Sequence, residues 1–263
     1  MTIAGLGEIN AYDLPVYLMI FLFGITIGSF LNVCILRIPL KESITFERSH
    51  CMSCGYQLQW FDLIPLFSYL FLRGKCRKCK AHISSQYPIV EAVNGVLYVL
   101  VFLINGWSID SLIYCFFTSA LLVLSVIDFR TYEIPFGINV FILGLGLIHL
   151  VLHLGDWVEY LIGLLCVSLF LEVLYQISGG TWIGGGDVKL MASAGLLLGW
   201  ENILLAFFLG CILGSVIHVL RMKFSGEEHV LAMGPYLAAG CFLAVLWGDR
   251  FLNWYLGFMR VTV

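Results

Sequence analysis

Two aspartates, Asp128 and Asp187, lie at the ends of long apolar segments, where an ionisable side chain is costly. Asp128 closes the apolar run 112–127, and Asp187 follows the glycines 184–186 and precedes another apolar run. A charged group at a hydrocarbon boundary is by default a candidate for function. The alternative is that each aspartate only caps a helix, because Asp is favoured at helix N-termini.

A pair of carboxylates that the fold holds close together can hydrolyse a peptide bond. Like charges a few ångströms apart repel, so the two groups do not both ionise easily. One carboxylate then takes a proton from water while its protonated partner polarises the peptide carbonyl. If the fold brings Asp128 and Asp187 together, this pattern predicts an aspartyl protease.

A second group of residues could bind a metal ion. Two Cys-x-x-Cys pairs, Cys51 with Cys54 and Cys76 with Cys79, flank the segment 55–75. This spacing is typical of a zinc ribbon, because each pair can place two thiolates on one tetrahedral ion. Disulfide pairing is the alternative, but disulfides are rare in the reducing cytoplasm, to which we assign this segment below. The five other cysteines lie singly in apolar runs and are interpreted as small buried hydrophobes.

Composition places these residues in an integral membrane protein. Hydrophobic residues make up 60% of the chain, charged residues only 12%, and the mean hydropathy is +0.96. Soluble domains approach a quarter charged residues, so the composition excludes that class. The sixth apolar segment is short and contains glycine, so either seven or eight spans are possible. Runs long enough to cross the bilayer are expected near 14–36, 89–105, 110–127, 136–154, 157–177, 187–199, 201–221 and 232–256.

The distribution of Lys and Arg predicts the orientation of these spans. The segment 37–88 holds eight of the fourteen basic residues, so the positive-inside rule assigns it to the cytoplasm. Counting eight spans puts Asp128 and Asp187 on the same cytoplasmic face, with the N-terminus outside. Seven spans would move two basic residues outside, which favours eight. The basic residues expected on the cytoplasmic face beyond residue 88 are Arg130, Lys189, Arg221 and Lys223.

Five sequence segments, in order along nearly the whole chain, resemble one protein family, the type IV prepilin peptidases. The segments are 28–33 (GSFLNV), the block 51–91 with LRGKCR at 72–77 and YP at 87–88, 127–135 with IDFRT and IP, 184–190 (GGGDVKL) and 234–236 (GPY). The resemblance implies a bifunctional enzyme of the bacterial cytoplasmic membrane. Such enzymes cleave the basic leader of prepilins and pseudopilins and then N-methylate the new terminus with S-adenosylmethionine.

The resemblance also assigns roles to residues of this chain. It maps the catalytic carboxylates of a GxGD-type aspartyl protease onto Asp128 and Asp187. Phe136 stands where many members have Asp, and Met52 where the family often has Pro, but neither change touches a proposed catalytic atom or metal ligand. Both Cys-x-x-Cys pairs are present, which is typical of the long, methylating form.

The methyl donor needs a pocket of its own. Segment 37–88 has no glycine-rich βαβ unit, so S-adenosylmethionine is expected in an atypical pocket. A cationic cofactor favours anionic or aromatic groups. Gly74 and Lys75 are further candidates because they adjoin the zinc ligand Cys76. The available anionic and aromatic groups are Glu47, Trp60, Asp62 and Glu91.

We therefore expect an all-α polytopic membrane protein of about eight transmembrane helices, with a small zinc-ribbon-like cytoplasmic domain after the first helix. The expected divisions are 1–36 for the tail and first span, 37–88 for the zinc-binding and methyl-transfer domain, and 89–263 for the peptidase. Expected partners are Zn²⁺, prepilins or pseudopilins and the lipid bilayer, with no nucleic acid.

The paired carboxylates also allow an alternative to this interpretation, a membrane transporter. Paired intramembrane carboxylates also build ion paths in transporters, with the cysteine segment then a docking module. Transporters tend to show internal repeats, and none is found in this sequence. His149 and His153 fall toward the outer face and are interpreted as snorkelling or structural side chains.

Overall fold

The computed structural model describes residues 13–45, 48–225 and 232–261. Within these ranges the chain forms eight α-helices and no β-strand, which confirms the expected all-α class. The N-terminal tail 1–12 and the candidate Glu47 lie outside the described residues. The chain divides into two compact units, residues 1–107 and 108–263, and each is described by itself. The predicted functional divisions at 37–88 and 89–263 stay predictions.

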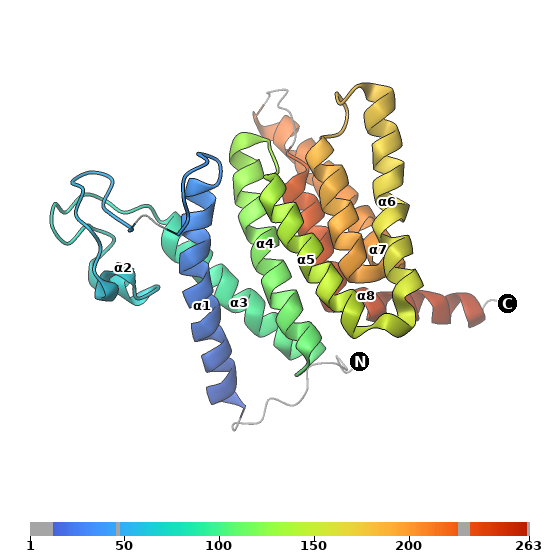
Figure 1. The fold of residues 1–263 in the computed structure, drawn as a ribbon, viewed down its shortest axis with the longest axis horizontal. Coiled ribbons are helices and arrows are strands. Elements are labelled where there is room, and N and C mark those ends of the chain that lie inside the picture. The colour runs from blue at the N-terminus through green and yellow to red at the C-terminus, as the bar shows by residue number, and fades with distance from the viewer. Residues whose placement is uncertain (1–12, 46–47, 226–231, 262–263) are drawn as a thin grey trace. The chain divides into compact units, whose positions relative to one another are not determined.

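Helices α1 (Leu14–Arg37) and α3 (Gln86–Asn105) form the membrane-type part of the first unit and pack against each other (Figure 1). Their backbones approach closely at glycines. A Cβ atom on Gly28 would lie 2.7 Å from the Cα of Glu91, and one on Gly24 the same distance from the Cα of Gly95. Small residues four apart allow such contact between apolar helices, where no hydrophobic force drives association.

Buried amides add polar contacts to the same helix pair. Asn94 donates to the carbonyl of Gly24 at 2.8 Å, and Asn32 donates to the carbonyl of Tyr87 at 3.1 Å. Between the two helices runs the four-cysteine segment, residues 38–85, which contains the short helices η1 (Trp60–Leu63) and α2 (Phe67–Phe71). The first unit is therefore a helix pair with a compact polar insertion.

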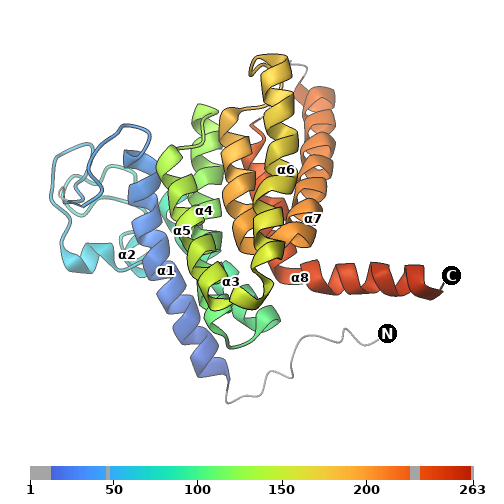
Figure 2. The ribbon, with the colours of Figure 1, turned by 45° about the vertical axis from the view of Figure 1, so that its right-hand side comes forward.

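The second unit is a helical bundle in which α7 has the most neighbours. Helix α7 packs against α5, α6 and α8, while α4 packs against α5 and α8 (Figure 2). A short 3₁₀ turn, η2 (Leu154–Asp156), joins α5 to α6. The helices are α4 (Ile109–Thr131), α5 (Phe136–Leu152), α6 (Trp157–Ser178), α7 (Gly185–Ser225) and α8 (Gly234–Val261).

Helix α7 is two helices joined at Gly199. This residue has φ 78° and ψ 171°, a backbone conformation that favours glycine and ends the first helix. An unbroken helix over 185–225 would be about 60 Å long, twice the hydrocarbon thickness. The break divides α7 into two helices that match the two runs expected near 187–199 and 201–221, and their crossing of the membrane as separate spans stays a prediction.

Five helices among the described residues are long and apolar enough to cross a membrane, and α5 is a shorter apolar helix. With α7 divided at Gly199 and α8 included, the segments correspond one to one with the eight expected spans. The last part of α8 differs from the expectation of a span over 232–256, because it turns away from the bundle in both views (Figures 1 and 2). Its exposed Phe251, Trp254 and Tyr255 suit a membrane–water interface rather than a bundle core.

Candidate functional site

Asp128 lies in the last turn of α4 and is 4% exposed. Its Oδ2 atom accepts a hydrogen bond of 3.0 Å from the backbone N–H of Gly234, the first residue of α8. A Cβ atom at position 234 would lie only 2.6 Å from that oxygen, so glycine is required there. The dipole of α4 disfavours a carboxylate at its C-terminus, so helix capping does not explain Asp128.

Asp187 lies in the first turn of α7, directly after three glycines. Its backbone N–H donates to the carbonyl of Gly184 at 3.0 Å, and its Oδ2 lies 3.2 Å from where a Cβ of Gly184 would be. A Cβ on Gly186 would lie 2.9 Å from the Cβ of Ile134. The glycines therefore let the start of α7 lie against the loop that follows α4.

The fold makes Asp128 and Asp187 electrostatic neighbours, and each repels a negative charge on the other. We call this part of the second unit the aspartate end: α4 and α6 end there, and α5, α7 and α8 begin there (Figure 1). Asp187 still occupies a position where a carboxylate favours helix formation, so its two roles are compatible. A carboxylate pair of this kind can supply one general base and one general acid.

Lys189 follows Asp187 by two residues, and its side chain contacts an aromatic ring. Its Nζ lies 5.5 Å from the ring centroid of Phe136, the first residue of α5. This cation–π contact keeps the ammonium on the exposed surface. Phe136, which stands where many family members have Asp, thus contacts Lys189 at the start of α5.

The four cysteines of the Cys-x-x-Cys pairs come together in the first unit. The Sγ atoms of Cys51, Cys54, Cys76 and Cys79 all lie within 4.8 Å of one another, and all four thiols are free. Cys51 Sγ and Cys79 Sγ are 3.8 Å apart. Four sulfurs about 2.3 Å from one tetrahedral ion would be separated by about 3.8 Å. The four sulfur ligands and the distance between them therefore fit a tetrahedral metal ion.

The two cysteine pairs are held by the same backbone structure, repeated along the chain. The N–H of Cys51 donates to Tyr56 O at 2.9 Å, and the N–H of Cys76 donates to Ala81 O at 2.8 Å. In each turn the residue after the second cysteine has a positive φ. These residues are Gly55, with φ 67°, and Lys80, with φ 60°.

Backbone donors prepare one thiol of the cluster for metal binding. The N–H groups of Ser53 and Cys54 lower the pKa of Cys51 to about 6, so its thiolate forms at neutral pH. The N–H of Ala81 also favours the Cys79 thiolate. Neighbouring thiols and desolvation nevertheless raise the pKa of Cys79 to about 11. Because thiolates, not thiols, bind metal, a cation must supply the energy that ionises the remaining groups.

The candidate methyl-donor residues have distinct environments. Asp62 is already paired within the four-cysteine segment, because it accepts from Arg77 Nε at 2.7 Å and from Tyr56 at 3.3 Å. Trp60 is 77% exposed. Gly74 and Lys75 directly precede the ligand Cys76, and Gly74 has φ 67° beside the Tyr69 ring.

Glu91 connects the four-cysteine segment to α3. Its buried carboxylate accepts a 2.8 Å hydrogen bond from the N–H of Leu66 and a further one from Ser29. A buried carboxylate needs such donors to offset its desolvation. Glu91 therefore has a positioning contact in addition to any role toward a ligand.

Some residues near these sites were given no role from the sequence. The role of Gly234 depends on a contact with Asp128 across 106 residues, so no local signal could reveal it. Asn139, in the first turn of α5, is buried and neither side-chain amide atom has a hydrogen-bond partner in the described part of the chain. The sequence signal that could have pointed to Asn139 was the presence of a polar residue inside an apolar run.

An all-helical protein with several membrane-type helices, two neighbouring aspartates at one end of a bundle and four cysteines that could hold a metal ion has the features of a polytopic membrane peptidase. Comparisons with known proteins agree. The family model described as "Bacterial Peptidase A24 N-terminal domain" matches residues 22–104, and that described as "Type IV leader peptidase family" matches residues 115–219. The chain belongs to the type IV leader peptidase family.

Curated relatives are similar over nearly their whole length. A protein of Bacillus subtilis (strain 168) named "Prepilin leader peptidase/N-methyltransferase" is 34% identical over 241 residues, covering 90% of this chain and 97% of the relative. A protein of the same name from Aeromonas salmonicida (strain A449) is 32% identical, covering 94% of this chain and 96% of the relative. Another, from Pseudomonas aeruginosa, is 30% identical, covering 96% of this chain and 98% of the relative. No solved structure matches the chain.

Proposed function

We propose that this protein is a membrane aspartyl endopeptidase that removes the leader of type IV prepilins or pseudopilins and then N-methylates the new terminus. The observation that carries the proposal is the meeting of Asp128 and Asp187 at one end of the bundle, in a chain whose relatives are named for both reactions. The transporter alternative has no support from these relatives.

The proposed mechanism follows from the different partners of the two carboxylates. The Gly234 N–H stabilises the ionised form of Asp128, so Asp128 takes the proton of the attacking water. Asp187, beside that negative charge, holds the proton and donates a hydrogen bond to the scissile carbonyl. As the tetrahedral intermediate collapses, Asp128 gives the proton that it took from water to the amine leaving group, and the hydroxyl oxygen becomes the new carboxyl group.

The proposed setting is the bacterial cytoplasmic membrane, with the aspartate end facing the cytoplasm and the N-terminus outside. This orientation puts the basic side chains Arg130 and Lys189 on the cytoplasmic side with the four-cysteine segment. A substrate with an apolar helical stem and a basic leader would then present its scissile bond near the membrane surface. The lipid bilayer is thus the second partner.

For the methyltransferase, we propose that Zn²⁺ occupies the Cys51, Cys54, Cys76 and Cys79 cluster and stabilises the four-cysteine segment. The 3.8 Å sulfur separation and free thiols support zinc over a disulfide. When bound, S-adenosylmethionine supplies an electrophilic methyl group. Gly74, Lys75 and Glu91 are the proposed contacts, because Gly74 and Lys75 adjoin Cys76 and Glu91 holds Leu66.

The first test replaces each catalytic aspartate by asparagine, which keeps the volume but cannot titrate. Detergent-purified Asp128→Asn and Asp187→Asn should each lose leader cleavage by at least about 10³-fold, read as the mobility shift of a leader-bearing prepilin. Asp156→Asn, an exposed aspartate between α5 and α6, is the matched control and should keep wild-type activity. Robust cleavage by either site variant contradicts the assignment.

A further inference from the structure

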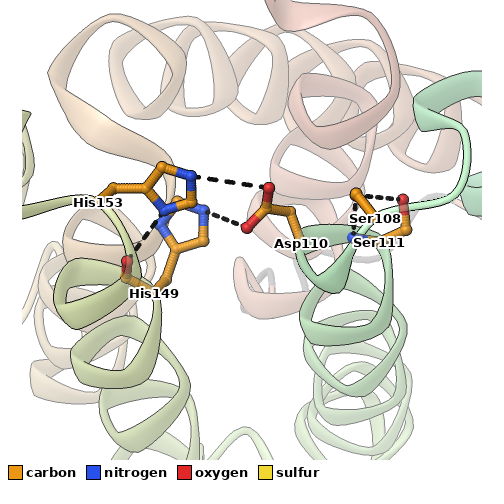
Figure 3. Close-up of polar contacts among 5 residues, drawn as sticks. All are labelled: Ser108, Asp110, Ser111, His149 and His153. Carbon is orange, nitrogen blue, oxygen red and sulfur yellow. Dashed lines mark hydrogen bonds and ion pairs between the residues drawn. The ribbon is translucent and has the colours of Figure 1, made fainter.

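Three titratable side chains meet at the end of the bundle opposite the aspartate end. Asp110 is the second residue of α4, His149 lies in the last turn of α5, and His153 follows the end of α5 directly. The two histidines are four residues apart and so share one face of the helix end. Figure 3 shows both rings directed at the Asp110 carboxylate. One ligand atom from each residue lies within 4.8 Å of the others.

The nitrogen–oxygen separations in this cluster exceed those of direct hydrogen bonds and come near those of ligands around an ion. His149 Nε2 is 3.5 Å from Asp110 Oδ1, and His153 Nε2 is 3.7 Å from Asp110 Oδ2. A charge-assisted hydrogen bond would bring nitrogen and oxygen to about 2.7–2.9 Å. A tetrahedral ion about 2.0–2.1 Å from each ligand atom would hold neighbouring ligand atoms about 3.3 Å apart.

The surroundings orient the ligand atoms. The Nδ1 atom of His153 lies 3.1 Å from the carbonyl oxygen of His149, and this contact assigns the proton to Nδ1 and leaves Nε2 as an acceptor. Asp110 is held by the start of α4, where the Ser111 N–H donates to the Ser108 hydroxyl at 3.0 Å (Figure 3). The His153 contact is the kind of outer contact that fixes a metal ligand, whereas the Ser108–Ser111 bond caps the helix turn that carries Asp110.

The burial of His149 supports a ligand at the same place. The residue is 3% exposed, and its Nδ1 atom has no hydrogen-bond partner among the described residues. Its ring stacks on that of His153 at 4.4 Å between centroids and meets the edge of the Tyr160 ring at 5.2 Å. A buried imidazole whose Nε2 atom has only a 3.5 Å contact gains from a further group bound at that atom, whereas the ion would leave Nδ1 unpartnered among the described residues.

We propose that Asp110, His149 and His153 bind a divalent first-row transition-metal ion such as Zn²⁺ through the carboxylate and the two Nε2 atoms. Imidazole and carboxylate ligands suit such borderline ions. The ion joins the start of α4 to the end of α5, and its remaining coordination positions take water. Asp110 and Asp128 are at opposite ends of α4, about 27 Å apart at 1.5 Å per residue, so the site is separate from the aspartate pair and does not depend on the proposed function.

The test counts metal ions per chain in the purified full-length protein after equilibration with Zn²⁺ and removal of unbound ion. The wild type should hold two zinc ions, one at the cysteine cluster and one at Asp110, His149 and His153. Asp110→Asn and His153→Gln should each hold one. His218→Gln, an imidazole change in the second half of α7 away from any such cluster, should hold two.

A measurement on the wild type alone protects the test against variants that misfold. With Co²⁺ as the probe, one equivalent should give thiolate-to-cobalt charge-transfer absorption, and the second should add only d–d bands. The second ion should also be released first as the pH falls below about 6, because protonated imidazole cannot bind metal. One metal ion per wild-type chain, or charge-transfer absorption that accounts for all bound cobalt, would overturn the proposal.

Discussion

Asp128 and Asp187 have the same side chain but different backbone partners. Asp128 accepts a hydrogen bond from Gly234 N–H, whereas Asp187 is beside Gly184 at the start of its own helix. Unequal environments are the usual way in which a carboxylate pair separates the roles of acid and base. The geometry at Gly234 can therefore be tested without touching either carboxylate.

Gly234→Ala should reduce cleavage by about 10²-fold, because the new Cβ would lie 2.6 Å from Asp128 Oδ2 and displace it. The matched control is Gly144→Ala in α5, where a Cβ would have no heavy atom within 4 Å. The measurement is the cleavage rate of a leader-bearing prepilin at saturating substrate. Equal rates for both variants would mean that Gly234 does not position Asp128.

Lys80 and Gly55 each follow the second cysteine of a Cys-x-x-Cys pair, and both have a positive φ. This conformation strains a lysine but not a glycine. Lys80→Gly should therefore strengthen metal retention by the cysteine cluster, by about 1 kcal/mol or fivefold in apparent affinity. The measurement is competition with a chelator that absorbs on binding zinc. Gly55→Ala should shift the midpoint in the opposite direction, and a loss of affinity in Lys80→Gly would contradict the argument.

At the scale of elements, close backbone contacts position the helices. Glycines in α1 allow contact with α3, and Gly163 of α6 lies against Gly195 and Gly199 of α7. In an apolar solvent such contacts replace the hydrophobic effect as the source of packing energy. Larger residues at these places should separate the helices.

Gly28→Val should lower the free energy of unfolding of the first unit by about 1–3 kcal/mol, because its Cβ would collide with the backbone of Glu91. Leu22→Val, on a 39% exposed position of the same helix, is the control and should have little effect. Thermal unfolding in detergent and trypsin cleavage after Lys75 measure the difference. Identical melting of the two variants would exclude close α1–α3 packing as a determinant of stability.

At the scale of the whole molecule, the two proposed reactions use different units. The carboxylate pair belongs to residues 108–263, and the cysteine cluster to residues 1–107. Methylation requires a free amine, so cleavage must come first. A mutation can therefore abolish methylation and leave cleavage intact, but a mutation that abolishes cleavage should abolish methylation too.

Asp187→Asn should lose both products, whereas Lys75→Ala or Glu91→Gln should still yield cleaved but poorly methylated pilin. The mass of the pilin N-terminal peptide from each variant decides this. Arg73→Ala, at another basic residue near the cysteine ligands, is a control for loss of charge alone. Fully methylated peptide from both Lys75→Ala and Glu91→Gln would contradict a role of these two residues in methyl transfer.

Much of the architecture could be predicted from local sequence. Twenty-residue apolar runs specify helices because the bilayer leaves no other partner for backbone N–H and C=O groups. The short run before Gly199 was correctly separated from the next because glycine permits the break. The Cys-x-x-Cys spacing indicated the four-cysteine cluster because the two residues of each pair are close in sequence.

What only the tertiary structure decided depends on contacts between distant residues. The Gly234 hydrogen bond to Asp128 joins the end of α4 to the start of α8, and no periodicity encodes it. His149 and His153 were interpreted from the sequence as snorkelling or structural side chains. Their convergence on Asp110 follows only when α4 and α5 pack side by side. Apolar pattern and spacing thus determined which helices and ligand pairs form, while helix packing decided which polar groups share a site.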